Sequence, residues 1–151
     1  MARLLGREPS GSFTVTVRRR DGSPVVILNA PLLDDGTPMP TRYWLVDPAL
    51  RDDVSRLEAS GGVRRAEALV DAAAVAEAHA RYAAERDRAV AVGHRGPRPS
   101  GGVGGTREGV KCLHAHLAWF LAGGDDPVGR WVAQELALDP SAYVVEGEGD
   151  R

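Results

Sequence analysis

The composition is most informative in what this chain of 151 residues lacks. It has one cysteine, Cys112, which excludes an intrachain disulfide framework and is typical of a reducing cytoplasm. No apolar run approaches the ~20 residues that a membrane-spanning helix needs. The N-terminal residues also lack the apolar stretch of a secretory signal. We therefore expect a cytoplasmic protein without membrane insertion.

Aromatic residues and lysine are also scarce. Aromatic residues make up 5% of the chain, so a stacking surface for single-stranded nucleic acid is not expected. The net charge of -2 does not favour a general nucleic-acid binder either. Lys111 is the one lysine among 19 basic residues. This arginine bias points to a GC-rich coding sequence rather than to many roles specific to arginine.

The near-neutral net charge conceals two oppositely charged ends. Residues 1–20 carry five basic residues and one acidic residue, a net charge of 5 − 1 = +4. Residues 125–151 carry two basic and seven acidic residues, a net charge of 2 − 7 = -5. Two solvated termini are the favoured interpretation, because exposed charges interact weakly. Attraction between the two ends, or separate partners for them, is the alternative.

The N-terminal part has the patterns of β-strands. Apolar residues alternate with polar ones over residues 13–18, Asp21-Gly22 suits a tight turn, and residues 24–30 form an apolar return strand. Residues 41–46 are aromatic and β-prone, which predicts a third strand. We therefore predict an N-terminal β-hairpin within a small antiparallel sheet of about three strands.

The rest of the chain has helical patterns. Asp47-Pro48 is a typical helix start, and we predict four to five helices that pack against the sheet, giving an α+β domain over residues 1–140. The predicted helices cover residues 47–60, 63–92 (one helix, or two joined near Asp71), 106–121 and 126–138. The alanine-rich face of the second segment predicts close packing against another helix. Residues 141–151 are predicted to be an acidic, frayed tail.

A glycine-rich segment over residues 93–105 precedes the third predicted helix. Flexibility is the favoured interpretation. The alternative is an anion site, because backbone N–H groups at a helix N-terminus can bind an anion. The candidate residues of that site are Gly104, Gly105, Thr106, Arg107 and Lys111. The segment has neither the ending of a nucleotide-binding P-loop nor a clear strand before it.

The densest group of reactive side chains lies around Cys112. In an unbroken helix Cys112 and His116 share a face, whereas His114 lies on the opposite side. Cys112 and His116 could bind zinc or iron together with Asp47 or His94. Alternatively, His116 could activate Cys112 as a nucleophile. The favoured interpretation is that Cys112 is a small apolar residue and that both histidines make ordinary hydrogen bonds.

Three blocks of sequence together resemble a known family. They are RLLGREPSG, LLDDGTPMPTRYWLVDPAL followed by SRLEASGG, and GGVGGTREGVKCLHAHLAWFLAGGDDPVGRW. They resemble the uncharacterised bacterial family called domain of unknown function five-zero-one, which occurs chiefly in high-GC Gram-positive bacteria. The resemblance covers Arg3 to Leu136 and implies a small cytoplasmic protein without assigned activity. It also implies gene neighbours for enolase, a septum-formation initiator and an exopolyphosphatase-like enzyme.

This chain departs from the family at two places. Relatives often carry a cysteine near the first hairpin, where this chain has Arg20 or its neighbours, and another where this chain has Asp47. The block with Cys112, His114 and His116 is retained. If relatives bind metal through several cysteines, this chain binds it weakly, with Asp47 as a substitute ligand, or not at all.

Three functions follow from these observations. The first is a binding or adaptor domain of unassigned role, favoured because no catalytic constellation stands out. The second is a metalloprotein or enzyme centred on Cys112 and His116, with Lys111 or Arg107 receiving a small anion. The third is a protein partner of the division or envelope machinery, which rests on the gene neighbourhood of the family alone.

Overall fold

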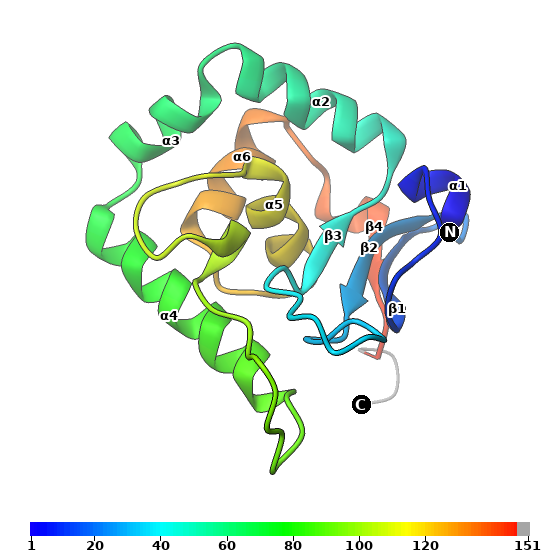
Figure 1. The fold of residues 1–151 in the computed structure, drawn as a ribbon. Coiled ribbons are helices and arrows are strands. Elements are labelled where there is room, and N and C mark those ends of the chain that lie inside the picture. Colours follow the sequence, from blue (N-terminus) through cyan, green and yellow to red (C-terminus); the bar gives the residue numbers. More distant parts are fainter. Residues whose placement is uncertain (148–151) are drawn as a thin grey trace.

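The computed structural model describes residues 1–147 and confirms an α+β fold. The strands form one antiparallel sheet in the order β3-β2-β1-β4, and α5 and α6 lie between this sheet and an arch of α2, α3 and α4 (Figure 1). The elements are α1 (Ala2–Leu5), β1 (Phe13–Arg19), β2 (Pro24–Asn29), β3 (Tyr43–Leu45), α2 (Pro48–Ala59), α3 (Gly62–Leu69), α4 (Ala72–Arg88), the 3-10 turn η1 (Val103–Gly105), α5 (Leu113–Leu121), α6 (Pro127–Glu135), the 3-10 turn η2 (Pro140–Ala142) and β4 (Tyr143–Val145).

The predicted N-terminal hairpin is confirmed. β1 and β2 pair antiparallel, with Phe13 opposite Asn29. The turn between them has Gly22 at φ +92°, where a side chain would be strained, and the Asp21 carboxylate accepts the N–H of Ser23. Val17 on β1 is fully buried together with the apolar middle of β2, so this hairpin forms one wall of the core.

The C-terminal segment differs from the predicted frayed tail. Tyr143–Val145 form a fourth strand, β4, which pairs with β1 and places Val145 opposite Val17. Arg18 Nε also lies 2.7 Å from Glu146 Oε1. One basic residue of the start thus pairs with one acidic residue of the end, and both side chains stay partly in solvent, at 38% and 50% exposure. The rest of the predicted tail, residues 148–151, lies outside the described residues.

The alanine-rich segment forms two helices rather than one. Val70 is extended (φ -93°, ψ 134°), and the Asp71 carboxylate caps α4 by accepting the N–H of Ala74 at 3.0 Å. The prediction that the alanine face packs against another helix is wrong, because Ala76 and Ala80 are exposed. A neighbouring face of α4 is buried instead, and its large side chains, such as Val75 and Tyr82, remove more apolar area from water than alanine would. The buried residues of α4 are Val75, Ala78, His79, Tyr82 and Arg86.

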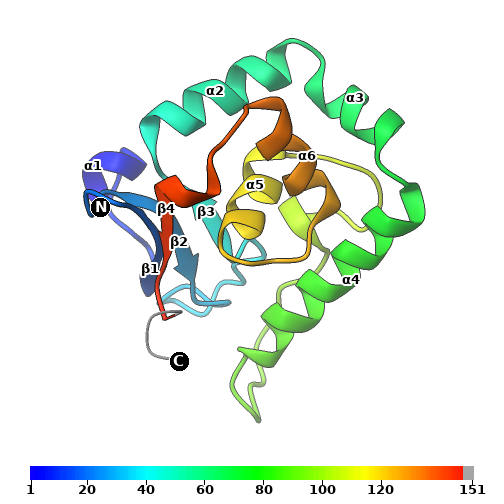
Figure 2. The ribbon, with the colours of Figure 1, turned by 180° about the vertical axis from the view of Figure 1, so that it is seen from behind.

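The helix predicted over residues 106–121 begins seven residues later, at Leu113. Gly109 has φ +67° and Cys112 is extended (φ -143°, ψ 111°), so the preceding segment is not helical. The helix that remains, α5, is surrounded on several sides and packs closely against α6 (Figure 2). No helix within residues 1–147 has the length and apolarity needed to cross a membrane.

Gly129 sets the distance between α5 and α6. A Cβ atom at this position would lie 2.4 Å from the His116 carbonyl oxygen and 2.4 Å from Phe120 Cβ. We therefore expect Gly129→Ala to destabilise the protein by about 1–3 kcal/mol through overpacking. Urea unfolding followed by circular dichroism measures this change.

Gln134→Ala, at an exposed position of the same helix, is the matched control and should change stability by less than about 0.5 kcal/mol. Equal stability of Gly129→Ala and the wild type would contradict the close α5–α6 contact.

Candidate functional site

Cys112 lies immediately before the first turn of α5. It is the N-cap residue of that helix, and its side chain is partly exposed. The N-terminus of a helix stabilises a negative charge through its free N–H groups and its dipole. This position therefore favours the thiolate form of Cys112, which is the form that binds metals and acts as a nucleophile.

His114 and Glu58 complete a cluster with Cys112. His114 Nδ1 lies 3.0 Å from Glu58 Oε1, and Glu58 Oε2 accepts the N–H of Leu113 at 3.0 Å. One ligand atom from each of Cys112, His114 and Glu58 lies within 4.8 Å of the other two. Among residues 1–147, this is the group of three His, Cys, Asp or Glu side chains that could hold a metal ion.

The second ring nitrogen of His114 is held by α2. Nε2 lies 3.2 Å from the carbonyl oxygen of Arg51 and 3.2 Å from Ser55 Oγ. Because a carbonyl oxygen only accepts hydrogen bonds, Nε2 carries a proton. In the neutral ring the lone pair is then on Nδ1, the nitrogen that faces Glu58. The backbone of α2 therefore fixes the tautomer that presents Nδ1 to the cluster.

The pKa values of Cys112 and His114 shift in opposite directions. Burial raises the pKa of the Cys112 thiol, but the neighbouring His114 side chain and the N–H of Ala115 lower it by more. The pKa of His114 is raised by its contact with Cys112 and by the Glu58 carboxylate, against the opposing effect of burial. The two shifts together favour a thiolate beside an imidazolium when no cation is bound.

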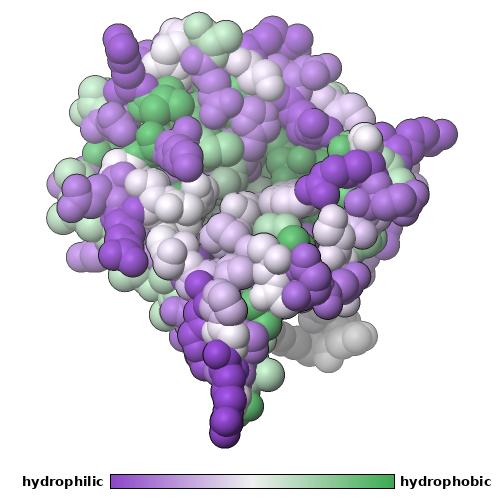
Figure 3. Space-filling model, in the orientation of Figure 1, coloured by the Kyte–Doolittle hydropathy of each residue, from purple (hydrophilic) through white to green (hydrophobic). Residues whose placement is uncertain are grey.

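A pocket of about 730 Å³ opens beside this cluster. Its volume lies within the range of small-molecule sites, and the face that it occupies is hollowed near its centre (Figure 3). Cys112 and His114 line the pocket together with residues from α1, β3 and α2. The remaining lining residues are Leu5, Thr41, Tyr43, Trp44, Leu45, Pro48, Arg51, Asp52, Ser55, Gly104 and Ala115.

The predicted pairing of Cys112 with His116 is wrong. His116 is fully buried, and its Nδ1 lies 2.7 Å from Asp126 Oδ2, which is also fully buried. Asp126 in addition caps α6 by accepting the N–H of Val128 at 3.0 Å. The helical spacing failed because the helix begins after Cys112, which leaves His114 as the histidine beside the thiol. His116 therefore links α5 to the start of α6 through Asp126, which is a structural role.

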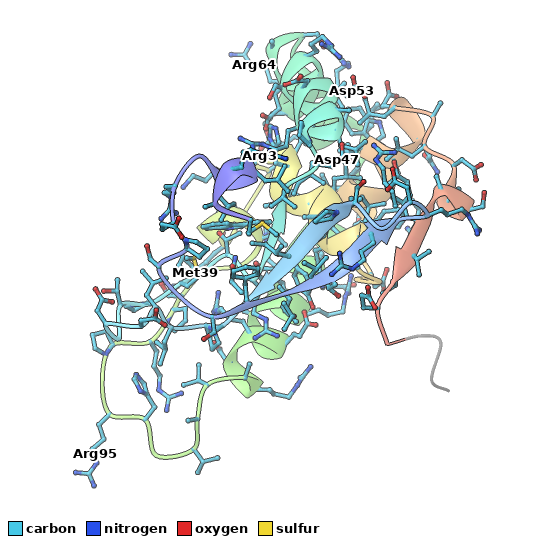
Figure 4. All side chains as sticks on the ribbon, turned by 90° about the vertical axis from the view of Figure 1, so that its right-hand side faces the viewer. Arg3, Met39, Asp47, Asp53, Arg64 and Arg95 are labelled. Atoms are coloured by element: carbon cyan, nitrogen blue, oxygen red, sulfur yellow. The ribbon has the colours of Figure 1, made fainter. Side chains whose placement is uncertain are left out.

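The two further candidate ligands lie elsewhere. The Asp47 carboxylate is buried at the start of α2, where it accepts from Arg19 Nε at 2.5 Å and from the N–H of Leu50 at 3.0 Å (Figure 4). His94 is part of the loop after α4, and its Nε2 lies 3.1 Å from the Pro97 carbonyl oxygen. Neither side chain belongs to the group formed by Cys112 and its neighbours.

The predicted anion site is not assembled as expected. The glycine-rich loop leads into an irregular segment rather than into a helix, so no helix N-terminus follows Gly104, Gly105 and Thr106. The N–H of Gly105 bonds within the loop to the Gly102 carbonyl. Gly104 lines the pocket beside Cys112, whereas Arg107 lines a different pocket against α4. Lys111 is exposed next to Cys112 and lines neither pocket.

Glu58 is the site residue that the sequence analysis missed. It is one of 21 acidic residues and lies in the polar part of an amphipathic helix. Its partners, Leu113 and His114, are more than 50 residues away along the chain. No local pattern marks it, because its role comes entirely from the packing of α2 against α5.

Comparison with known protein families places this chain in one of them. The family described as "Protein of unknown function (DUF501)" matches residues 15–134, which is 120 of the 151 residues. The chain therefore belongs to this family, as its resemblance indicated. Searches of the curated proteins and of the solved structures found no match. Family membership assigns no activity, and the adaptor and cell-division interpretations stay predictions.

The buried contact between His116 and Asp126 gives a prediction about stability. Replacing Asp126 by alanine leaves His116 Nδ1 without its partner and removes the α6 cap, so we expect a loss of about 2–4 kcal/mol. Denaturant unfolding measures the loss. Asp125→Ala changes a neighbouring carboxylate that is 69% exposed, and it should cost less than about 1 kcal/mol. Equal effects of the two substitutions would contradict a structural role of His116.

The contact between Cys112 and His114 gives a prediction about reactivity. In chelator-treated protein, the pH profile of iodoacetamide alkylation should show a Cys112 pKa below that of an unperturbed thiol. In His114→Gln this pKa should rise, and alkylation at pH 7 should slow several-fold, because the thiolate loses its neighbouring positive charge. His94→Gln is the matched control and should behave as the wild type. A profile unchanged by His114→Gln would refute the contact.

Proposed function

We propose that this protein binds one zinc ion through Cys112 Sγ, His114 Nδ1 and a carboxylate oxygen of Glu58. A thiolate, an imidazole and a carboxylate are all ordinary zinc ligands. Zinc bonds of about 2.0–2.3 Å place tetrahedral ligand atoms about 3.3–3.8 Å apart. One ligand atom of each of these three side chains already lies within 4.8 Å of the other two, and His114 Nδ1 is 3.0 Å from Glu58 Oε1. A side-chain shift of at most about 1 Å therefore completes the geometry.

The observation that carries the proposal is the way in which the backbone holds two of the ligands. The Nε2–H group of His114 faces the Arg51 carbonyl, and Glu58 Oε2 accepts the N–H of Leu113. Metal-binding histidines almost always donate their other N–H in this way, and ligating carboxylates are similarly hydrogen-bonded. The atoms that remain, Nδ1 and Oε1, are the ones that face each other beside Cys112.

A Cys–His–Glu triad is less well supported by the same contacts. In such a triad one ring nitrogen serves the nucleophile and the other faces the carboxylate. Here Nε2 of His114 contacts the Arg51 carbonyl and Ser55 Oγ. Nδ1 is therefore the one ring nitrogen left to interact with both the Glu58 carboxylate and the Cys112 thiol. This arrangement suits a shared cation better than a proton relay.

The ligand set favours zinc over iron. Non-haem iron(II) centres typically use two histidines and one carboxylate, whereas this cluster offers one histidine and a thiolate. Three protein ligands leave one tetrahedral position, and Cys112 and His114 also line the pocket. An open fourth position is typical of catalytic zinc centres, in which the pKa of bound water falls to about 7. We therefore propose a zinc centre of the catalytic type.

We also propose that the protein works in the cytoplasm. A thiolate ligand requires a reduced cysteine, and the cytoplasm keeps thiols reduced. The single cysteine of the chain supports this proposal, since no second cysteine competes for Cys112 within the molecule.

The proposal predicts one zinc ion per chain in protein purified without chelator. Cys112→Ser, His114→Gln and Glu58→Gln should each lower zinc affinity at least tenfold, because each removes or weakens one of three ligands. Zinc at 100 times its Kd should stabilise the wild type by about 2.7 kcal/mol. Elemental analysis and competition with a zinc-responsive dye measure these quantities.

Glu58→Gln keeps an oxygen that can accept the Leu113 N–H, so its effect reports on the metal rather than on the fold. His94→Gln is the matched histidine control and should bind zinc like the wild type. Wild-type protein that is free of zinc and does not take it up would overturn the proposal.

A further inference from the structure

We propose that the pocket beside the zinc site binds a small monocarboxylic acid with an apolar body, whose carboxylate lies between the metal position and Arg51. This inference rests on the proposed zinc site. It names the chemical class of the ligand, which the zinc site alone does not specify.

Part of the pocket lining is apolar. Leu5 from α1, Trp44 and Leu45 from β3, Pro48 from α2 and Ala115 from α5 all line it. The Trp44 side chain is only half-buried, and its ring has the guanidinium of Arg7 on it at 5.6 Å. An apolar ligand body would remove this surface from water, at roughly 25 cal/mol for each Å². The wall therefore favours an organic ligand over an inorganic anion.

Several polar residues of the pocket lining lie on α2. Arg51, Ser55 and Glu58 are four and three residues apart, so they lie on the same side of the helix. Arg51 and Ser55 line the pocket, and Glu58 is the proposed zinc ligand. Arg51 thus lies on the same helix face as the proposed ligand Glu58, two turns before it, and it lines the same pocket as Cys112 and His114.

Arg51 has donors to spare for a carboxylate. Its Nη1 donates to the Leu4 carbonyl at 2.9 Å, and no acidic side chain in the described part of the chain lies within 4.0 Å of its guanidinium nitrogens. A guanidinium matches the planar geometry of a carboxylate and binds it through two parallel hydrogen bonds. A ligand carboxylate would thus have Arg51 on one side and the open zinc position on the other.

Asp52 restricts the ligand to a single negative charge. It is adjacent to Arg51 and also lines the pocket. A second carboxylate on the ligand would lie near this side chain and be repelled. A monocarboxylate satisfies Arg51 and the metal and leaves Asp52 in water.

The test uses zinc-loaded full-length protein and hexanoate as the probe, with binding measured by isothermal titration calorimetry. Hexanoate should bind at least tenfold more tightly than hexanamide, which lacks the charge, and than acetate, which lacks the apolar body. Inorganic phosphate should compete weakly. In cobalt-substituted protein, hexanoate should also change the visible absorption spectrum, because it enters the coordination sphere.

Arg51→Gln should weaken hexanoate binding about tenfold, which corresponds to about 1.4 kcal/mol. Arg64→Gln is the matched control, since Arg64 lies exposed on α3 and extends away from the body of the molecule (Figure 4). It should bind hexanoate like the wild type. The comparison of the three probes on wild-type protein remains decisive even if Arg51→Gln is unstable.

The possible failures are distinguishable. Protein that holds one zinc ion but does not prefer hexanoate to hexanamide and acetate would overturn this inference and leave the zinc site intact. Equal hexanoate affinity of Arg51→Gln and the wild type, or of zinc-loaded and zinc-free protein, would also overturn it. Protein that holds no zinc would overturn the proposed function, and this inference with it.

Discussion

The structure of the site depends on the Glu58 carboxylate, which joins the end of α2 to the start of α5. One oxygen accepts the N–H of Leu113, and the other lies 3.0 Å from His114 Nδ1. The first contact satisfies a free N–H group of the α5 N-terminus, where Cys112 makes no side-chain cap. The second orients the imidazole toward the thiol. A single side chain thus connects the packing of two helices with the geometry of the candidate metal centre.

The features that depend on short-range rules were predictable from the sequence. Asp21-Gly22 gave the hairpin turn because glycine tolerates positive φ, and Asp47-Pro48 gave the start of α2 because the carboxylate accepts the N–H of Leu50. The break at Asp71 followed the same capping chemistry. In each case the decisive partners lie within a few residues, so the local sequence contains the interaction.

The features that depend on distant partners were not predictable. β4 forms because β1, more than 100 residues earlier, offers it an edge. Glu58 becomes a site residue through α5, and no pattern in α2 marks it. The error at Cys112 is different, because a signal was present. Gly109 disfavours a helix by about 1 kcal/mol relative to alanine, and its φ of +67° shows that the helix begins beyond it. With the helix start at Leu113, His114 rather than His116 is the histidine beside Cys112.

The proposed zinc position lies where Glu58 of α2 meets Cys112 and His114 at the start of α5, with a pocket beside it. In the proposed site, zinc is bound by one sulfur and two lighter protein atoms. X-ray absorption at the zinc edge of the zinc-loaded protein tests it most directly. We expect one sulfur at about 2.3 Å and nitrogen or oxygen ligands at about 2.0–2.2 Å from the zinc ion. A zinc coordination shell of nitrogen and oxygen alone would contradict the proposed site.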